Sequence, residues 1–286
     1  NNVKIDVNFT PTANLSSIKG GVTEVASSTL NICDGEEVLF SASPSNVGFS
    51  YAFTINNIEV QARSTLSTYT SNSLSNNDQV RVEVYNGLTT DTDACSDLSE
   101  RFLIQTLLTP NPTLISNTVA NTYCEGEEII FTAGSDLASN TYEFSIGAVS
   151  YQVSTTNIFI PSELDPPIFL NNNDVVRVEV TANQSPLGSC SAIASITMIE
   201  NAVYNPGLIT TASLTLCYGS VPSPLTNVTS ATAFGAVSYS WESSLDSITF
   251  TPIPSTNSST YSPGSLSVTT YFRRAAISTS NGKTCI

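Results

Sequence analysis

Residues 77–84 read Asn-Asp-Gln-Val-Arg-Val-Glu-Val, and residues 173–180 read Asn-Asp-Val-Val-Arg-Val-Glu-Val. Valine alternates with charged or polar residues in both stretches, and this period of two predicts a β-strand that buries its valines on one face. Residues 269–276 (Thr-Thr-Tyr-Phe-Arg-Arg-Ala-Ala) occupy the equivalent place further along the chain. The sequence therefore predicts the same strand three times.

The sequence around these strands repeats about every 95 residues. Each repeat carries two cysteines, the first at positions 33, 124 and 217 and the second at 95, 190 and 285. The first cysteine opens the motif Cys-Asp-Gly-Glu-Glu in the first repeat, Cys-Glu-Gly-Glu-Glu in the second and the looser Cys-Tyr-Gly in the third. A fixed period of this kind indicates a series of tandem modules rather than a single catalytic domain.

Proline marks the boundaries between the repeats. Thr10-Pro11, Thr109-Pro110 and Asn205-Pro206 each follow an alternating apolar run, where an X-Pro pair ends strand pairing. We expect residues 1–9 to be the last strand of a preceding module. The expected modules are residues 10–108, residues 109–204, and residues 205–286, the last truncated at its C-terminal end.

Each module has room for about seven short strands separated by turns. No stretch shows a sustained apolar period of 3.6 residues. We therefore predict an all-β chain of tandem immunoglobulin-like β-sandwich modules. Phe53, Phe144 and Trp241 end the recurring Tyr-x-Phe or Tyr-x-Trp motif, and we expect them in the core. Stacking of a sugar on Trp241 is the alternative.

The six cysteines, two in each repeat, predict an oxidising compartment and one disulfide in each module. Reduced, buried cysteines are the alternative. The chain has neither histidine nor a Cys-x-x-Cys motif, which argues against zinc. Each predicted bridge would stabilise its module by about 4 kcal/mol. The predicted pairs are Cys33–Cys95, Cys124–Cys190 and Cys217–Cys285.

The sequence predicts no catalytic residue, no cofactor-binding residue and no enzyme activity. Without histidine there is no Ser-His-Asp or Cys-His arrangement, and no Gly-rich phosphate loop is present. The neighbouring carboxylates Glu36 with Glu37, and Glu127 with Glu128, would point to opposite faces of a strand. They are therefore not the converging pair that a glycosidase needs.

Calcium is the one ligand that the sequence raises as a hypothesis. A Cys33–Cys95 bridge would gather acidic residues at one end of the first module, and several carboxylates together suit a hard cation. Residues 183–189 hold no acidic residue at the equivalent place in the second module, so a solvated acidic loop is the alternative. The candidate ligands are Asp34, Glu36, Asp91, Asp93 and Asp97.

Only 12% of the residues are charged, yet the formal net charge is −15. The excess of acidic residues lies in the first two repeats. An acidic surface argues against nucleic acid and against an anionic membrane as direct partners.

The motifs Cys-[Asp/Glu]-Gly-Glu-Glu, Tyr-x-Phe, Asn-Asp-x-Val-x-Val and the closing cysteine resemble the repeats of very large surface adhesins of gliding Bacteroidetes, of the SprB type. Residues 239–246, 260–264 and 269–274 resemble another common repeat of the same proteins, although the third copy departs from the Cys-x-Gly-Glu-Glu pattern. The resemblance implies type IX secretion, attachment to the outer membrane surface, and the gliding and secretion machinery as partners.

Three functions follow as hypotheses. The first is a structural and adhesive rod that links the cell surface to a substratum or surface polysaccharide during gliding motility. The second is an array of carbohydrate-binding modules, and the third is an accessory region of a secreted hydrolase. The single tryptophan and the recurrence of tyrosines at core-like positions favour the rod. In a rod, the partners of each module are its neighbours in the same chain.

Overall fold

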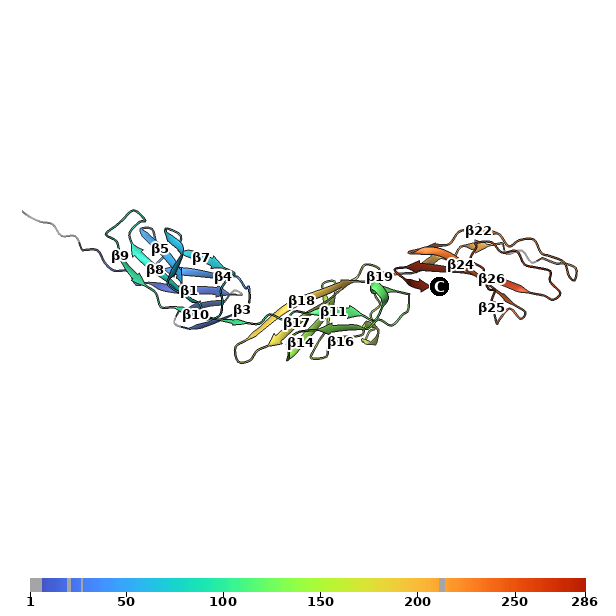
Figure 1. Cartoon of the computed structure of the whole chain (residues 1–286), viewed down its shortest axis with the longest axis horizontal. Coiled ribbons are helices and arrows are strands. Elements are labelled where there is room, and N and C mark those ends of the chain that lie inside the picture. Colours follow the sequence, from blue (N-terminus) through green and yellow to red (C-terminus); the bar gives the residue numbers. More distant parts are fainter. Residues whose placement is uncertain (1–6, 20–21, 27, 211–213) are drawn as a thin grey trace, which may run out of the picture. The chain divides into compact units, whose positions relative to one another are not determined.

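The computed structural model describes residues 7–19, 22–26, 28–210 and 214–286. Their regular structure consists of β-strands and two 3₁₀-helices, η1 (Val119–Asn121) and η2 (Pro161–Glu163) (Figure 1). The all-β prediction is confirmed. No helix within this part of the chain is long and apolar enough to span a bilayer. The strand expected over residues 1–9 falls mainly outside the described residues, and residues 7–9 form no strand.

The first module consists of two packed sheets. One has the strand order β2-β1-β4-β7 and the other β3-β10-β8-β5-β6, with β9 paired to β8. A sheet of β1, β4 and β7 packed against a sheet of β10, β8, β5 and β6 has the strand order of an immunoglobulin-like sandwich. The strands are β1 (Asn14–Lys19), β2 (Val22–Val25), β3 (Thr29–Cys33), β4 (Val38–Ser43), β5 (Phe49–Ile55), β6 (Ile58–Ser64), β7 (Thr68–Ser71), β8 (Gln79–Asn86), β9 (Cys95–Leu98) and β10 (Phe102–Leu107).

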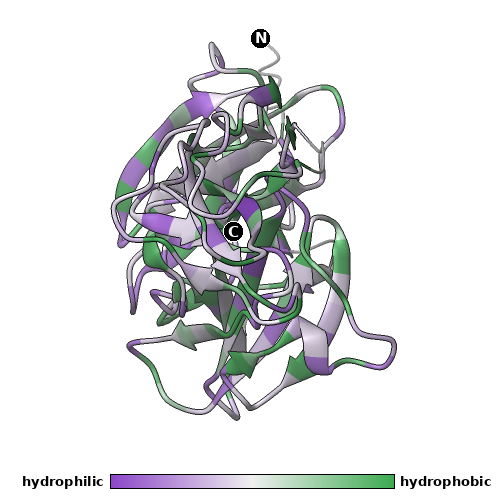
Figure 2. Ribbon diagram, turned by 90° about the vertical axis from the view of Figure 1, so that its right-hand side faces the viewer, coloured by the Kyte–Doolittle hydropathy of each residue, from purple (hydrophilic) through white to green (hydrophobic). Residues whose placement is uncertain are grey.

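Strand β8 lies in the centre of its sheet and shows the predicted alternation of buried and exposed side chains. Val80, Val82 and Val84 are fully buried, whereas Arg81 and Glu83 remain partly exposed. Hydrophobic and hydrophilic residues alternate along many of the strands (Figure 2). The valines pack with buried aromatic residues of both sheets, namely Phe40, Tyr51, Phe53 and Phe102. This burial is the main contribution that holds the two sheets together.

The second module repeats the order, with shorter strands in the sheet β11-β13-β16 and longer strands β17 and β18 in the facing sheet. Its sheets are β11-β13-β16, β15-β14-β17-β18 and the parallel pair β12-β19. Val176, Val178 and Val180 of β17 are buried with Phe131, Phe144 and Phe159. The strands are β11 (Thr113–Ser116), β12 (Thr122–Tyr123), β13 (Phe131–Gly134), β14 (Asn140–Ile146), β15 (Val149–Ser154), β16 (Ile158–Phe159), β17 (Val175–Asn183), β18 (Ser189–Thr197) and β19 (Ile199–Glu200).

The third module is built around the long antiparallel pair of strands β24 and β26. Its sheets are β25-β24-β26-β27, β20-β23 and β21-β22. The strands are β20 (Val203–Asn205), β21 (Leu208–Ile209), β22 (Asn227–Thr229), β23 (Thr232–Ala233), β24 (Ala236–Ser244), β25 (Thr251–Pro252), β26 (Tyr271–Ser280) and β27 (Lys283–Cys285). Strand β20 spans the boundary expected between residues 204 and 205, so the third module begins earlier than its Asn205-Pro206 pair.

Trp241 is the centre of the third core, as predicted. Its side chain has no exposed surface, its Nε1–H donates to Ser258 O at 2.9 Å, and its ring lies 5.5 Å from the ring of Tyr261. Tyr261 in turn contacts Phe272. The alternative in which Trp241 is a sugar-stacking platform is wrong, because stacking requires an exposed ring face.

By internal contacts the chain divides into two compact units rather than three. The first comprises residues 1–111, 136–140 and 181–192, and the second comprises residues 112–135, 141–180 and 193–286. Two segments of the second repeat thus cluster with the first module. We keep the terms module 1, module 2 and module 3 for the three groups of sheets.

Candidate functional site

The two disulfides of this structure join cysteines of different modules. Cys33 is bonded to Cys190 with a Cα–Cα distance of 5.7 Å, and Cys124 is bonded to Cys285 with a Cα–Cα distance of 5.5 Å. Cys95 and Cys217 carry no disulfide. The predicted pairs Cys33–Cys95, Cys124–Cys190 and Cys217–Cys285 are therefore wrong.

Strand register explains why the predicted pairing fails in module 1. Cys33 lies beside Leu107 at the end of β10, whereas Cys95 lies beside Asn86 at the end of β8. Since β8 and β10 are antiparallel, these two positions are about 11 strand residues apart, on the order of 35 Å. A disulfide requires Cα atoms within about 7 Å. The two cysteines of one module sit at opposite ends of its sandwich.

We call the end from which the chain leaves a module its C-terminal pole, and the opposite end its N-terminal pole. In modules 1 and 2 the first cysteine lies at the C-terminal pole, because β3 and β12 run parallel to the last strands β10 and β19. The second cysteine lies in the hairpin at the N-terminal pole. Both bridges therefore join the C-terminal pole of one module to the N-terminal pole of the next.

The motif Cys-x-Gly builds a tight turn at the C-terminal pole. The N–H three residues after the cysteine donates to the cysteine carbonyl in all three modules, at 3.0, 3.1 and 3.0 Å. The glycines Gly35, Gly126 and Gly219 have φ values of 76°, 76° and 78°, a conformation that residues with a Cβ rarely adopt. Glycine is thus required here to present the cysteine.

The first junction is the group of contacts around Cys33–Cys190. Asn31 Nδ2 donates to Leu187 O at 2.9 Å. Gln184 makes a reciprocal pair with the linker, accepting from Leu108 N at 3.0 Å and donating to Leu108 O at 2.7 Å. Side-chain amides of both modules thereby hold backbone groups across the junction, which adds directional contacts to the covalent bond.

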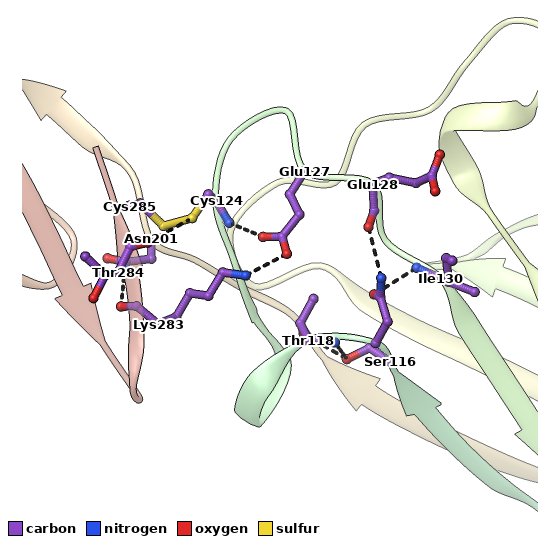
Figure 3. A network of polar contacts seen from close by, with 11 residues as sticks. Ser116, Thr118, Cys124, Glu127, Glu128, Ile130, Asn201, Lys283, Thr284 and Cys285 are labelled. Atoms are coloured by element: carbon purple, nitrogen blue, oxygen red, sulfur yellow. Dashed lines mark hydrogen bonds and ion pairs between the residues drawn. A yellow bond between two sulfur atoms is a disulfide. The ribbon is translucent and has the colours of Figure 1, made fainter.

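The second junction is the group of contacts around Cys124–Cys285 (Figure 3). Glu127 accepts from Cys124 N–H at 2.9 Å and from Lys283 Nζ at 2.6 Å, so its carboxylate joins the Cys-x-Gly turn to β27 of the next module. Asn281 Nδ2 donates to Thr122 Oγ1 at 3.0 Å. An ion pair, a hydrogen bond and a disulfide together fasten the two modules.

Asn201 is the buried polar centre of the second junction. It has no exposed surface, and its Nδ2 donates to Ser278 O at 3.1 Å and to Lys283 O at 2.9 Å. Its Oδ1 accepts from Ser278 Oγ, and its backbone N–H donates to Tyr123 O at 2.8 Å. The side chain of the linker residue thus satisfies groups of module 3 while its backbone pairs with module 2.

Replacing Asn201 by alanine is expected to lower the free energy of unfolding by about 1–3 kcal/mol. The truncation leaves the buried hydroxyl and the buried carbonyl of Ser278, and the half-buried carbonyl of Lys283, without these partners. Urea unfolding of the oxidised chain measures the loss. Asn281→Ala is the control, because Asn281 makes its contact at the rim of the same junction, and we expect a smaller loss. Equal losses in the two variants would contradict a buried centre at Asn201.

The Glu127 carboxylate has a lowered pKa. Burial by itself raises the pKa of this carboxyl, but the hydrogen bonds from Lys283 Nζ and Cys124 N–H, together with the lysine charge, outweigh it and hold the pKa below its ordinary value of 4.5. The charged form is therefore the one that the folded junction favours.

Glu127→Gln is expected to cost about 1 kcal/mol of unfolding free energy at neutral pH. Because the folded-state pKa is lowered, the contribution of the charge is complete above the unfolded-state pKa and is lost as the pH falls through the folded-state pKa below it. Urea unfolding between about pH 7 and pH 2 should show the variant and the wild type converging at the acidic end. Glu128→Gln, which alters an exposed carboxylate, is the control. A difference that stays constant with pH would refute the ion-pair interpretation.

The structure does not bring the five candidate calcium ligands together. Asp34 and Glu36 lie at the C-terminal pole of module 1, where Glu36 is paired with Lys19 at 3.3 Å. Asp91, Asp93 and Asp97 belong to the opposite pole, where Asp91 caps Leu88 N and Asp97 accepts from Ala13 N. The expected convergence depended on the Cys33–Cys95 bridge. Within the described part of the chain no group of three or more His, Cys, Asp or Glu is placed to hold a metal ion.

The residues that complete both junctions were not singled out from the sequence. No repeated motif includes Lys283, Asn201 or Gln184. The role of each residue depends on which end of a module it faces. The one available signal was the Cys-x-Gly motif, whose copies in modules 1 and 2 mark the C-terminal poles.

Comparison with known proteins gives one family and several structures. Residues 205–285 match a domain of unknown function (DUF8696). No curated protein matches the chain. Three N-terminal domains of the outer capsid protein Hoc of bacteriophage RB49 are 15% identical, with a TM-score of 0.43 and coverage of 96% of this chain and 94% of that chain.

Two further structures are also similar to this chain. Domains A168–A170 of titin are 11% identical, with a TM-score of 0.39 and coverage of 90% of this chain and 91% of that one. A Ca²⁺-stabilised adhesin with which an Antarctic bacterium binds ice is 13% identical, with a TM-score of 0.39 and coverage of 97% of this chain and 72% of that one. At these identities and TM-scores, the strand order described above is what identifies the immunoglobulin-like fold.

Proposed function

We propose that the chain is a structural and adhesive repeat segment of a secreted bacterial surface protein, in which immunoglobulin-like modules are joined end to end by disulfides. The single observation that carries this proposal is the pairing of Cys33 with Cys190 and of Cys124 with Cys285. Disulfides persist in extracytoplasmic, oxidising environments. A segment of this kind belongs on the cell surface.

The position of the bridges suits a load-bearing role. A peptide linker alone allows neighbouring modules to rotate and, under tension, to separate. A second covalent connection at each junction restricts both motions. The reciprocal Gln184–Leu108 pair and the Lys283–Glu127 ion pair hold the same ends in register. These features suit a spacer that holds an adhesive end away from the cell.

The finer assignment combines this architecture with the sequence motifs. The motifs resemble those of gliding-motility adhesins, and we propose that the segment links the outer membrane surface to a substratum during gliding, after type IX secretion. Its proposed partners are neighbouring modules, the gliding and secretion machinery, and a substratum or surface polysaccharide.

Antibody labelling of intact, unpermeabilised cells of the source bacterium tests the location. We expect labelling of intact cells and its loss after brief surface proteolysis. Deletion of residues 10–286 in frame should abolish surface spreading while leaving growth in suspension unchanged. Labelling only after permeabilisation, or normal spreading of the deletion strain, would refute the proposal.

Carbohydrate binding is the competing function. Trp241, Tyr51 and Phe53 are buried, so the recurring aromatic motif supplies core residues rather than stacking platforms. A glycan array with the oxidised chain is expected to show no ligand. Saturable binding to a glycan that survives substitution of exposed Tyr218 and Phe169 would favour the competing function elsewhere on the surface.

A further inference from the structure

The two internal junctions follow one pairing rule. In each, the cysteine of a Cys-x-Gly turn at a C-terminal pole bonds to the hairpin cysteine at the N-terminal pole of the following module. The two cysteines outside these bridges are one of each kind. Cys95 is a hairpin cysteine and Cys217 belongs to a Cys-x-Gly turn.

Cys217 has the geometry of a C-terminal-pole cysteine. Ser220 N–H donates to its carbonyl at 3.0 Å, as Glu36 and Glu127 do to Cys33 and Cys124. The turn is anchored by Gly219 N–H, which donates to Leu266 O at 2.8 Å. Leu266 precedes β26, whose first residue lies at the opposite end of the sheet from Cys285. The thiol-bearing residue is exposed.

Cys95 has the geometry of an N-terminal-pole cysteine, and an independent contact marks the place of its partner. At the first junction, Gln184 of the hairpin donates to Leu108 O, and Leu107 lies in register with Cys33. In module 1 the hairpin residue Asn86 donates to Phe9 O at 2.8 Å in the same manner.

Phe9 precedes Thr10-Pro11 as Leu108 precedes Thr109-Pro110. The residue before Phe9 is Asn8, which corresponds to Leu107. Cys95 Sγ lies 3.7 Å from Asn8 O. The thiol thus lies at the level where the first junction carries its bridging cysteine.

We propose that Cys95 and Cys217 are each one half of a further intermodule disulfide. Cys95 forms a disulfide with the Cys-x-Gly cysteine of a β-sandwich module docked at the N-terminal pole of module 1. Cys217 forms a disulfide with the hairpin cysteine of a module docked at the C-terminal pole of module 3. A second copy of this chain presents both kinds of partner. The inference rests on the pairing rule and is independent of the adhesive role.

The chemistry is thiol–disulfide exchange. One thiolate attacks a low-molecular-weight disulfide such as oxidised glutathione, and a mixed disulfide and one glutathione thiolate result. The partner thiolate then attacks the protein sulfur of the mixed disulfide. One protein S–S bond forms as one glutathione S–S bond is reduced, and the two thiol protons pass to the two released glutathione thiolates.

The test uses two variants of the whole chain. Cys95→Ser retains Cys217, and Cys217→Ser retains Cys95, so the mixture can form the proposed bond while neither variant can form it alone. Both are incubated at about 1 mM in a glutathione redox buffer, a concentration comparable to that which a short tether imposes. Non-reducing electrophoresis measures the yield of disulfide-linked dimer, and peptide mapping identifies the cysteines that are joined.

We expect the mixture to give a disulfide-linked dimer whose crosslink is Cys217–Cys95, in at least about tenfold excess over the dimer from either variant alone. Mapping should show Cys33–Cys190 and Cys124–Cys285 unchanged. Dimers of comparable yield from the single variants would overturn the proposal, because they indicate collision between exposed thiols. Absence of any dimer in the mixture would overturn it as well.

Discussion

Pulled from residues 1 and 286, the oxidised chain is expected to extend to about 350 Å, whereas the reduced chain is expected to reach about 1,000 Å. The difference arises because the two bridges overlap. The shortest covalent route runs from residue 1 to Cys33, crosses to Cys190, returns to Cys124, and crosses to Cys285. This route contains about 100 of the 286 residues, and each residue spans at most about 3.4 Å.

The same route decides which residues bear the force. Residues 34–123 and 191–284 lie outside it and are shielded while both bridges are intact. Module 2 is loaded between its two cysteines. Reduction should therefore release the shielded segments, and force spectroscopy with and without a reductant should record additional unfolding steps.

Two single variants distinguish this pairing from bridges within modules. Cys95→Ser is expected to leave the extension of the oxidised chain unchanged, because Cys95 is outside both bridges. Cys190→Ser opens the first bridge and should lengthen the route to about 430 Å. If bridges closed within each module, Cys95→Ser would instead add about 200 Å, and that result would refute the pairing described here.

Trp241→Ala is expected to lower the free energy of unfolding of module 3 by about 3–5 kcal/mol. The substitution removes the largest buried side chain of this module, its ring contact with Tyr261, and the partner of Ser258 O. The short strands around the β24–β26 pair provide few other large buried residues with which to fill the cavity.

Urea unfolding followed by circular dichroism measures the loss. Tyr218→Ala is the matched control, because Tyr218 is 86% exposed in the same module, and its removal should change stability by less than about 0.5 kcal/mol. Trp241→Phe should lie between the two, since it keeps an aromatic ring but loses the N–H donor. Equal stability of Trp241→Ala and the wild type would contradict a core role.

Short sequence patterns were sufficient to predict those structural elements that depend only on residues close together in the chain. The alternation of Val80, Val82 and Val84 predicted both the strand and its buried face, because strand geometry places every second side chain on the same side. The recurring Tyr-x-Phe or Tyr-x-Trp position predicted the buried Phe53, Phe144 and Trp241. The glycine of each Cys-x-Gly motif adopts the positive φ that such turns require.

The disulfides were predicted wrongly because the sequence period does not show whether a cysteine bonds within its own module or to the next module. A repeat with one cysteine of each kind is equally consistent with bonds inside a module and bonds between successive modules. Proximity along the chain favoured Cys33–Cys95, and the calcium hypothesis for Asp34, Glu36, Asp91, Asp93 and Asp97 inherited that error. Only the parallel pairing of β3 with β10 and the antiparallel pairing of β8 with β9 assign the two cysteines to different poles.

The amino-acid sequence by itself determined the β-strands and the buried aromatic residues, since both depend on side-chain alternation over a few residues. It also placed two cysteines in every repeat. The tertiary structure alone decided which cysteines meet and which polar side chains surround them. A disulfide forms only where two Cα atoms come within about 7 Å, and that distance is set by strand register across the whole sandwich.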